Sequence, residues 1–290
     1  MYAEAYLPKD DSVVLLELKN QDELKKIKKL EKAFKASSDN QDLANLISQK
    51  YIKLFRKENK PKYLSYAQTV LDKWWQGDAA KEIILSRAYI KQYNHKFKEA
   101  LKDLDLYLTK VSTDDQAHLI KSAIYNELQD FSNAKKECQS LTKSDLKEIC
   151  LLNAGELGLY AKLTNLEIKD AEIKTWFLTS LALAAQKLDK ASEAQDFYKK
   201  ALANDDNDIY LLKSYAGFLL EKKRYQEVVT LLENKTQNDY LLLRLAIAEK
   251  QLKHKKADEH IKQIKETIAI AKQLNEEVHS QELELLSFLD

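Results

Sequence analysis

Residues 175–235 read TWFLTSLALAAQKLDKASEAQDFYKKALANDDNDIYLLKSYAGFLLEKKRYQEVVTLLENK, and the second half of this stretch nearly repeats the first. Equivalent positions lie 34 residues apart: Leu181 and Tyr215, Ala182 and Ala216, Ala191 and Tyr225, Ala194 and Val228, Tyr198 and Leu232. Small residues at fixed positions let two helices approach closely, and large residues beside them fill the remaining space. A period of this kind predicts pairs of antiparallel helices stacked in a solenoid.

A second regular block precedes this stretch. Three of its positions recur after 34 residues: Ala88 as Ser122, Phe97 as Phe131, and Ala100 as Ala134. The register then slips, because two further periods from Ser122 lead to residue 190, whereas the next clear small position is Ala182, eight residues earlier. We therefore expect a contracted unit within residues 141–174, with Ala154 as its small residue and a short second helix.

The composition agrees with a helical protein and argues against several functions. Only 4 Gly and 2 Pro occur in 290 residues, and 44% of the residues are hydrophobic, which favours helices around a substantial core. The 47 basic and 46 acidic residues are interspersed, whereas nucleic-acid binders show a clustered basic excess. We expect the lysines between residues 25 and 35 to form the solvated face of an amphipathic helix. No apolar run approaches the ~18 residues that span a bilayer.

The pattern Leu178-x2-Leu181-Ala182-x2-Ala185, followed by Ala194-x3-Tyr198-x2-Ala201, resembles the tetratricopeptide repeat (TPR) family. The resemblance extends from Asp39 to the end of the chain. It departs from the family pattern in three ways: the consensus Trp is missing, Ala or Ser replaces the first-helix Gly, and Asp206 stands where the closing Pro usually lies. The fixed period across two separate pairs of units offsets these departures.

The resemblance implies an all-α fold, a right-handed α-α superhelix of six to seven helical hairpins with a C-terminal capping helix. Residues 1–38 are expected to hold an N-terminal segment and a capping helix, residues 39–274 the solenoid, and residues 275–290 the C-terminal capping helix. The expected units are 39–77, 81–114, 115–144, 145–174, 175–208, 209–238 and 239–274.

More narrowly, the chain resembles uncharacterised exported bacterial TPR proteins. The shared features are Tyr6-Leu7-Pro8, the segment YLSYAQ at 63–68, Trp74-Trp75, and the two mid-chain cysteines. This resemblance implies an exported protein, periplasmic or secreted, whose signal segment is missing from the given sequence, and a cytoplasmic location is the alternative. It also favours a disulfide between Cys138 and Cys150, in an oxidising compartment. The repeat positions alone leave open whether the two cysteines are bonded or are inert buried thiols.

In TPR proteins, ligands contact mainly positions 2, 5, 9, 12 and 13 of the first helix of each hairpin. Counting from units starting at 81, 115, 175 and 209 gives these polar or aromatic candidates for peptide or protein binding: Tyr89, Gln92, Tyr93, Asn126, Glu127, Gln186, Lys187, Tyr210 and Lys213, with Trp176 and Glu221 at further counted positions. Tyrosines among amides suit a peptide groove, although packing between repeats is an equally good reading of each one. Leu85 and Leu119 occupy the lysine position with which some family members clamp a chain-terminal carboxylate, which disfavours that function.

No catalytic or metal-binding pattern stands out. The five histidines include no pair at the i, i+4 spacing of a helical metal site, so we expect no metal and interpret them as surface residues. Carboxylate pairs such as Asp103 with Asp105, or Asp205 with Asp206, are expected to be solvated. There is neither a Gly-x-Ser-x-Gly motif nor a phosphate-binding glycine loop, so we expect no cofactor and no enzymatic activity.

These observations predict a non-enzymatic scaffold or adaptor that binds a protein or extended peptide in its concave groove, in the bacterial cell envelope, without nucleic acid or a transmembrane span. The alternative is an intracellular peptide-sensing regulator. Such regulators usually carry a DNA-binding or effector module, and residues 1–38 are too short for one and lack a helix-turn-helix. The sequence does not identify the partner or the oligomeric state.

Overall fold

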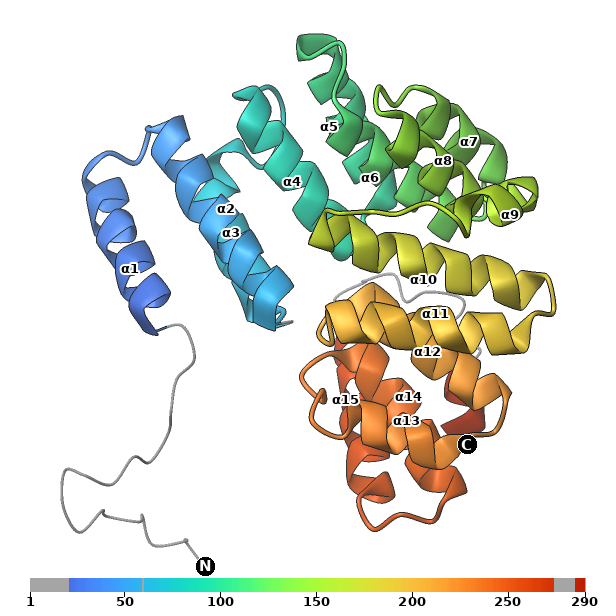
Figure 1. Ribbon diagram of the computed structural model, residues 1–290. Helices are drawn as coiled ribbons and strands as arrows, with labels where there is room; N and C mark the ends of the chain where they lie inside the picture. The colour runs from blue at the N-terminus through green and yellow to red at the C-terminus, as the bar shows by residue number, and fades with distance from the viewer. Residues whose placement is uncertain (1–20, 59, 274–284, 290) are drawn as a thin grey trace, which may run out of the picture.

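The computed structural model describes residues 21–58, 60–273 and 285–289, and this part of the chain is helical (Figure 1). The first eight α-helices are α1 (Gln21–Ala36), α2 (Gln41–Glu58), α3 (Lys62–Leu71), α4 (Lys81–Tyr93), α5 (Phe97–Lys110), α6 (Asp115–Glu127), α7 (Phe131–Gln139) and α8 (Ser144–Asn153). The others are α9 (Tyr160–Leu163), α10 (Ala171–Lys187), α11 (Ala191–Asn204), α12 (Ile209–Glu221), α13 (Tyr225–Leu232), α14 (Asp239–Gln251) and α15 (Ala257–Gln273). Three short 3-10 helices are η1 (Asp72–Trp74), η2 (Leu157–Leu159) and η3 (Ser287–Leu289).

Consecutive helices pair as antiparallel hairpins: α2 with α3, α4 with α5, α6 with α7, α10 with α11, α12 with α13, and α14 with α15. A fourth, irregular hairpin consists of α8 with η2 and α9. Helix α1 packs on α2 and covers the first hairpin. The predicted all-α, TPR-like superhelix is therefore confirmed.

The hairpins are held together at the small residues that set the sequence period. Ala88 of α4 and Ala100 of α5 are fully buried, as are Ala182 of α10 and Ala194 of α11. Because a methyl group occupies little space, the two helices of a hairpin approach closely, and neighbouring large side chains close the gap. Tyr198 is such a side chain, and it is fully buried between its own and the following hairpin.

The first helices from α4 onward all end in the same turn, in which one residue adopts the left-handed conformation. These residues are His95, Gln129, Asp189, Lys223 and Lys253, with φ between 52 and 58°, and Gly155 with φ 90°. At α12, for example, the N–H of Arg224 donates to the carbonyl of Leu219 at 2.8 Å, and that of Lys223 donates to Leu220 at 2.9 Å. This is a Schellman motif, in which glycine is the usual left-handed residue. The chain closes five such turns without glycine.

The eight-residue shortfall of the contracted unit begins earlier than the expected range of 141–174, because it falls between Gln129 and Gly155. Successive left-handed turn residues are 34 apart except from Gln129 to Gly155, which is 26, and from Lys223 to Lys253, which is 30. Helix α7 has 9 residues where α5 has 14, and α9 has only 4. The prediction that Ala154 is the mid-helix small residue of this unit is wrong, because Ala154 is the C-cap of α8.

A buried ion cluster joins α4 to α5. Asp103 is 6% exposed and accepts from Nη2 of Arg87 at 2.5 Å, while Nζ of Lys91 lies 2.8 Å from the same carboxylate. Arg87 also donates to the carbonyl oxygens of Trp74 and Gly77 and so holds the loop that precedes α4. The prediction that Asp103 is solvated is wrong, because two cations of α4 face it.

The same pairing recurs one period later, with Lys121 and Glu137 in place of the arginine and aspartate. Nζ of Lys121 lies 2.6 Å from Glu137, and Nδ1 of His118 lies 2.7 Å from the same carboxylate. In the last hairpin, His260 is 8% exposed, and its Nδ1 lies 2.6 Å from Glu249, which is almost fully buried. The interpretation of the histidines as surface residues is therefore wrong for His118 and His260. The half-buried Glu137 holds the first ring, and the buried Glu249 holds the second.

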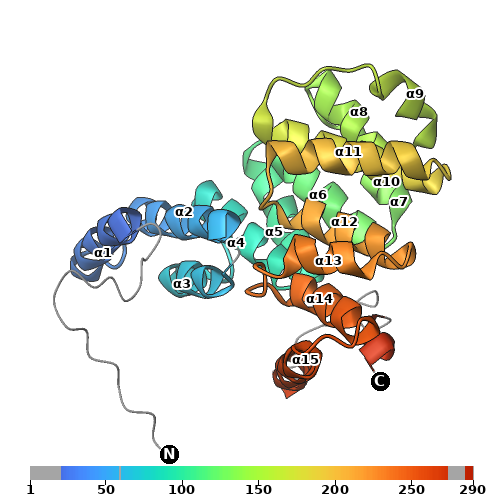
Figure 2. The same ribbon diagram turned by 60° about the horizontal axis from the view of Figure 1, so that its bottom comes forward.

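The hydrophobic core is divided at the contracted unit. One cluster runs from Ile27 to Ile124 and another from Ile149 to Leu289, with a small cluster around the two cysteines between them. Figure 1 shows the row of hairpins turning after α9, so that α10 runs below the ends of α4 and α6. Figure 2 shows the C-terminal hairpins stacked in order below α10 and α11.

The predicted terminal segments lie mostly outside the described residues. Residues 1–20 and most of the capping helix expected at 275–290 are not described, although Leu289 of η3 is buried against the C-terminal core cluster. The lysines of α1 between residues 25 and 35 are exposed, as expected. Across residues 21–58, 60–273 and 285–289, no helix has the length and apolar content needed to cross a membrane.

The left-handed turns predict a stabilising substitution. Lys223→Gly should raise the free energy of unfolding by about 1 kcal/mol, because glycine adopts a φ of 56° without the steric cost that a side chain brings. Lys222→Gly is the matched control, since Lys222 has a φ of −83° and should lose stability as glycine. Urea unfolding followed by circular dichroism measures both variants. Equal effects of the two substitutions would show that the left-handed turn carries no strain.

Candidate functional site

The concave side of the superhelix contains a cavity of about 260 Å³. Every residue that lines it belongs to the first helix of one of five successive hairpins: Arg56 from α2, Gln92 from α4, Gln116, Leu119, Ile120, Ser122, Ala123 and Asn126 from α6, Cys150 and Asn153 from α8, and Trp176 from α10. The lining therefore combines a guanidinium and four carboxamides with apolar and aromatic side chains. Such a mixture orients a ligand by a few polar groups on an apolar surface.

Arg56 forms one wall of the cavity. Its guanidinium lies 4.6 Å from the centroid of the Tyr89 ring, and its Nε donates to the Tyr89 hydroxyl at 3.0 Å. Tyr89 in turn contacts Tyr93, whose ring packs edge-on against Phe55 at 4.6 Å. The two tyrosines predicted to bind a peptide thus position Arg56 and fill space between α2 and α4. Burial raises the pKa of Tyr93, and the nearby Tyr89 and Asp208 raise it further.

The start of α12 lies across the concave side from α2 and α4. Tyr210 donates from its hydroxyl to Oδ1 of Asn153 at 2.8 Å, and burial raises the pKa of this tyrosine. Asn207 donates to the carbonyl oxygen of Lys57 at 2.6 Å, across 150 residues of sequence. Ile209 packs against the N-terminal core cluster. Through these contacts the C-terminal hairpins approach the N-terminal ones, which narrows the opening of the concave side.

A second contact closes the same side. The imidazole of His95, in the turn between α4 and α5, contacts the hydroxyl of Tyr240 at the start of α14, with ring centroids 5.7 Å apart. Lys213 also lies over the Tyr240 ring, with its Nζ 5.4 Å from the ring centroid. The N-terminal and C-terminal hairpins therefore touch, and the concave side is a partly closed cavity instead of a continuous open groove.

The predicted site residues divide into three groups. Gln92 and Asn126 line the cavity, while Tyr89, Tyr93, Tyr210 and Lys213 form the contacts around it just described. The structure places the rest apart from the cavity lining: Gln186 accepts from Tyr198 of its own hairpin, Lys187 lies over the Phe131 ring, and Glu127 is exposed. A role for any of these nine residues in binding stays a prediction.

Sequence reasoning missed three polar residues of the lining. Gln116 occupies position 2 of the unit that starts at 115, so the position rule itself could have identified it. Asn153 lies two residues before the left-handed Gly155, as Tyr93 lies two before His95, so counting back from the turn identifies it as position 13. Arg56 had no such signal. It belongs to the last turns of α2, which has 18 residues where α4 has 13.

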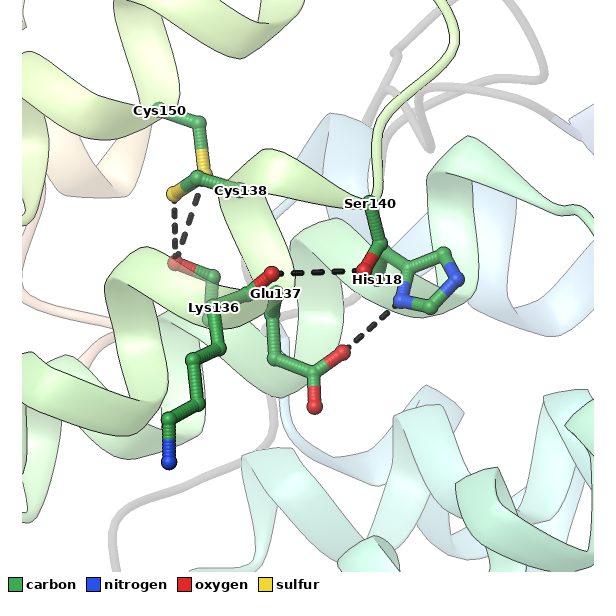
Figure 3. The surroundings of a disulfide bond; sticks show 7 residues. His118, Lys136, Glu137, Cys138, Ser140 and Cys150 are labelled. Carbon is green, nitrogen blue, oxygen red and sulfur yellow. Dashed lines mark hydrogen bonds and ion pairs between the residues drawn. A yellow bond between two sulfur atoms is a disulfide. The ribbon is translucent and has the colours of Figure 1, made fainter.

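A disulfide borders the cavity. Cys138 of α7 and Cys150 of α8 are bonded, with their Cα atoms 5.5 Å apart, and both side chains are buried (Figure 3). Oγ of Ser122 lies 3.2 Å from the sulfur of Cys138 and 3.3 Å from that of Cys150. Because a disulfide sulfur carries no proton, the hydroxyl is the donor in both contacts. The bond ties the contracted hairpin, and with it Asn153, to the preceding hairpin.

The stacked hairpins define the class of this molecule, which is a TPR-like helical-repeat fold. No protein-family model matches the chain, and no curated protein matches it. The similar solved structures include PilF of Pseudomonas aeruginosa, with 15% identity, a TM-score of 0.36, and coverage of 79% of this chain and 92% of that one. A tetratricopeptide repeat protein of Parabacteroides merdae has 14% identity, a TM-score of 0.43 and coverage of 92% of both chains.

A monomeric mutant of IFIT1 with Gppp-AAAA is also similar, with 16% identity, a TM-score of 0.36, and coverage of 84% of this chain and 58% of that one. The assignment of the fold rests on the hairpins and the 34-residue spacing of this chain itself.

The disulfide predicts a measurable loss of stability on its removal. Replacing both Cys138 and Cys150 by Ala should lower the free energy of unfolding by about 3 kcal/mol, since the bond closes a loop of 12-residue separation. Chemical denaturation of the oxidised protein and of the double variant gives the difference. A reductant should lower the stability of the unaltered protein and leave the double variant unchanged. Equal stabilities under oxidising conditions would contradict the assignment.

Proposed function

We propose that the chain is a non-enzymatic scaffold whose concave side holds a segment of a partner protein, in the bacterial cell envelope. The observation that best supports this is the convergence of five first helices on one cavity, each contributing a side chain from its concave face. Stacked hairpins keep these side chains in place before binding, so the receptor loses little conformational entropy when the partner arrives.

The contacts at the edges of the concave side limit the shape of the partner segment that can bind there. Asn207 reaches Lys57, and His95 reaches Tyr240, so a long peptide cannot run the full length of the superhelix without displacing them. A side chain or a short turn entering from the side of Arg56, which is exposed, meets no such obstacle. The proposed partner therefore inserts a short element into the cavity and does not thread through a groove.

The chemistry of the lining favours binding over catalysis. Ser122 is the one hydroxyl residue among the described lining residues, and it donates to the disulfide instead of pairing with a base. Guanidinium and carboxamide groups recognise polar ligands by hydrogen bonds and have no proton to exchange near neutral pH. This supports the proposal that the cavity recognises a partner without transforming it.

The proposed location rests on the disulfide, because such bonds persist in oxidising compartments such as the periplasm. The alternative function, an intracellular peptide-sensing regulator, predicts free thiols at Cys138 and Cys150. Alkylation of the protein in intact cells, followed by mass spectrometry, separates the two. A single disulfide-linked peptide supports the envelope, and two alkylated cysteines support the intracellular alternative.

Site-specific cross-linking tests the binding side. Benzoylphenylalanine in place of Gln116, in the cavity, should cross-link in vivo to one contiguous segment of one protein. The matched control is the same residue in place of Lys102, which is exposed on the second helix α5. Adducts that are identical from the two positions, or absent from position 116, would contradict the proposal.

A further inference from the structure

Three carboxamides line the cavity without a hydrogen-bond partner among the residues that the structure describes. Among the described residues, no side-chain hydrogen bond is made by Gln92, Gln116 or Asn126, all of which line the cavity. Exposed or half-buried amides elsewhere, such as Gln68 and Gln139, also make no side-chain hydrogen bond within the described residues. The three in the cavity differ because they line one surface together and because Oδ1 of Asn126 is shielded from solvent.

Asn126 shows the cost of this arrangement. Its Oδ1 is shielded from solvent and accepts no hydrogen bond within the described part of the chain. A polar atom in that state destabilises the folded protein relative to an apolar group of the same shape. Rotation about the Cβ–Cγ bond exchanges Oδ1 and Nδ2, so the residue can present either a donor or an acceptor to a group in the cavity.

A fourth carboxamide is already oriented. Oδ1 of Asn153 accepts from Tyr210, and this bond fixes which end of the amide faces away from the tyrosine. The Nδ2 group, which only donates, is left for other contacts. Together the four amides offer hydrogen-bond donors and acceptors in similar numbers. A ligand group that itself both donates and accepts hydrogen bonds would therefore match them.

The charges around the cavity do not favour an ion. Arg56 is stacked on Tyr89 and bonded to its hydroxyl. Two carboxylates act on the tyrosines at the edge of the cavity, since, in addition to burial, the charge of Asp208 raises the pKa of Tyr93 and the charge of Glu127 raises the pKa of Tyr210. Because a guanidinium lies on one side of the cavity and carboxylates on the other, their electrostatic potentials largely cancel and would not attract a charged ligand. A neutral polar ligand is the better match.

We infer that the cavity binds an uncharged carboxamide carried on a short apolar stem, such as a glutamine or asparagine side chain. The amides of Gln92, Gln116 and Asn126 would donate hydrogen bonds to it and accept hydrogen bonds from it. Leu119 and Trp176 would pack against the apolar stem. The volume of about 260 Å³ lies below that of pockets for drug-sized ligands and suits a single side chain. This inference rests on the proposed function only in taking the cavity as the binding site.

Titration with capped amino acids tests the ligand class. N-acetyl-glutamine methylamide should shift the side-chain amide signals of Gln92, Gln116 and Asn126 in the ¹H–¹⁵N spectrum of the full chain. The leucine and glutamate analogues have a similar shape and lack the neutral amide. They should bind at least about tenfold more weakly, the effect of one or two hydrogen bonds. Equal affinities for the three probes, or no shift with glutamine, would overturn the inference.

Free glutamine is the second arm of the titration. If capped glutamine binds more tightly than free glutamine, the carboxamide belongs to a segment of a partner protein. The reverse order identifies a free small molecule as the ligand. Either order supports the amide-binding cavity, and binding of neither compound overturns it.

A substitution at Asn126 provides an independent test without ligand. Asn126→Leu should raise the melting temperature of the free protein, because it removes an unpaired buried amide, and should abolish binding of capped glutamine. Asn133→Leu is the matched control. Asn133 is also in the α6–α7 region but donates to Asp130 at 2.6 Å, so its loss should lower the melting temperature. A lower melting temperature for Asn126→Leu would overturn the inference, since it would mean that the amide is structural.

The two proposals fail in different ways. If position 116 cross-links a partner while Asn126→Leu binds that partner as well as the unaltered protein does, the amide inference fails and the scaffold proposal stands. If capped glutamine binds in the cavity but no cross-link forms in cells, the scaffold proposal fails and the amide inference stands.

Discussion

The close approach of two helices at buried small residues is the constraint on which this fold depends. Ala88 with Ala100, and Ala182 with Ala194, are fully buried in their hairpins, where a much longer side chain would push the helices apart, so these residues set the internal spacing. Hairpins of equal spacing stack at regular intervals, and the same positions of successive first helices then face the same side. The concave surface is a consequence of this geometry.

The contracted hairpin changes what the repeat would otherwise build. A short α7 and a four-residue α9 interrupt the stacking, and the second core cluster begins there. After this joint the C-terminal hairpins turn toward the first ones, until Asn207 meets Lys57 (Figure 1). The disulfide of Cys138 and Cys150 lies at the same joint. We interpret it as a clamp that fixes the angle of the turn and so the size of the cavity.

Much of the fold followed from the sequence, because period and side-chain size are local properties. The hairpins and the short second helix of the irregular unit were predicted in this way, whereas the shortfall of eight residues begins upstream of the expected range. Asp103 was misjudged because its burial depends on Arg87 and Lys91, which share the helix preceding its own. The cavity could not be predicted from the sequence for a similar reason. Its closure requires residues 150 positions apart to meet, and no pattern within one repeat specifies that contact.

Contact between the N-terminal and C-terminal edges partly closes the concave side. Spin labels at Lys53→Cys and Asp206→Cys, both exposed and close to the contact of Lys57 with Asn207, report on it directly. The native cysteines do not take up label, because they are bonded to each other. Pulsed electron resonance should give one narrow, short distance distribution. A broad distribution at long distances would describe an open superhelix and contradict the account.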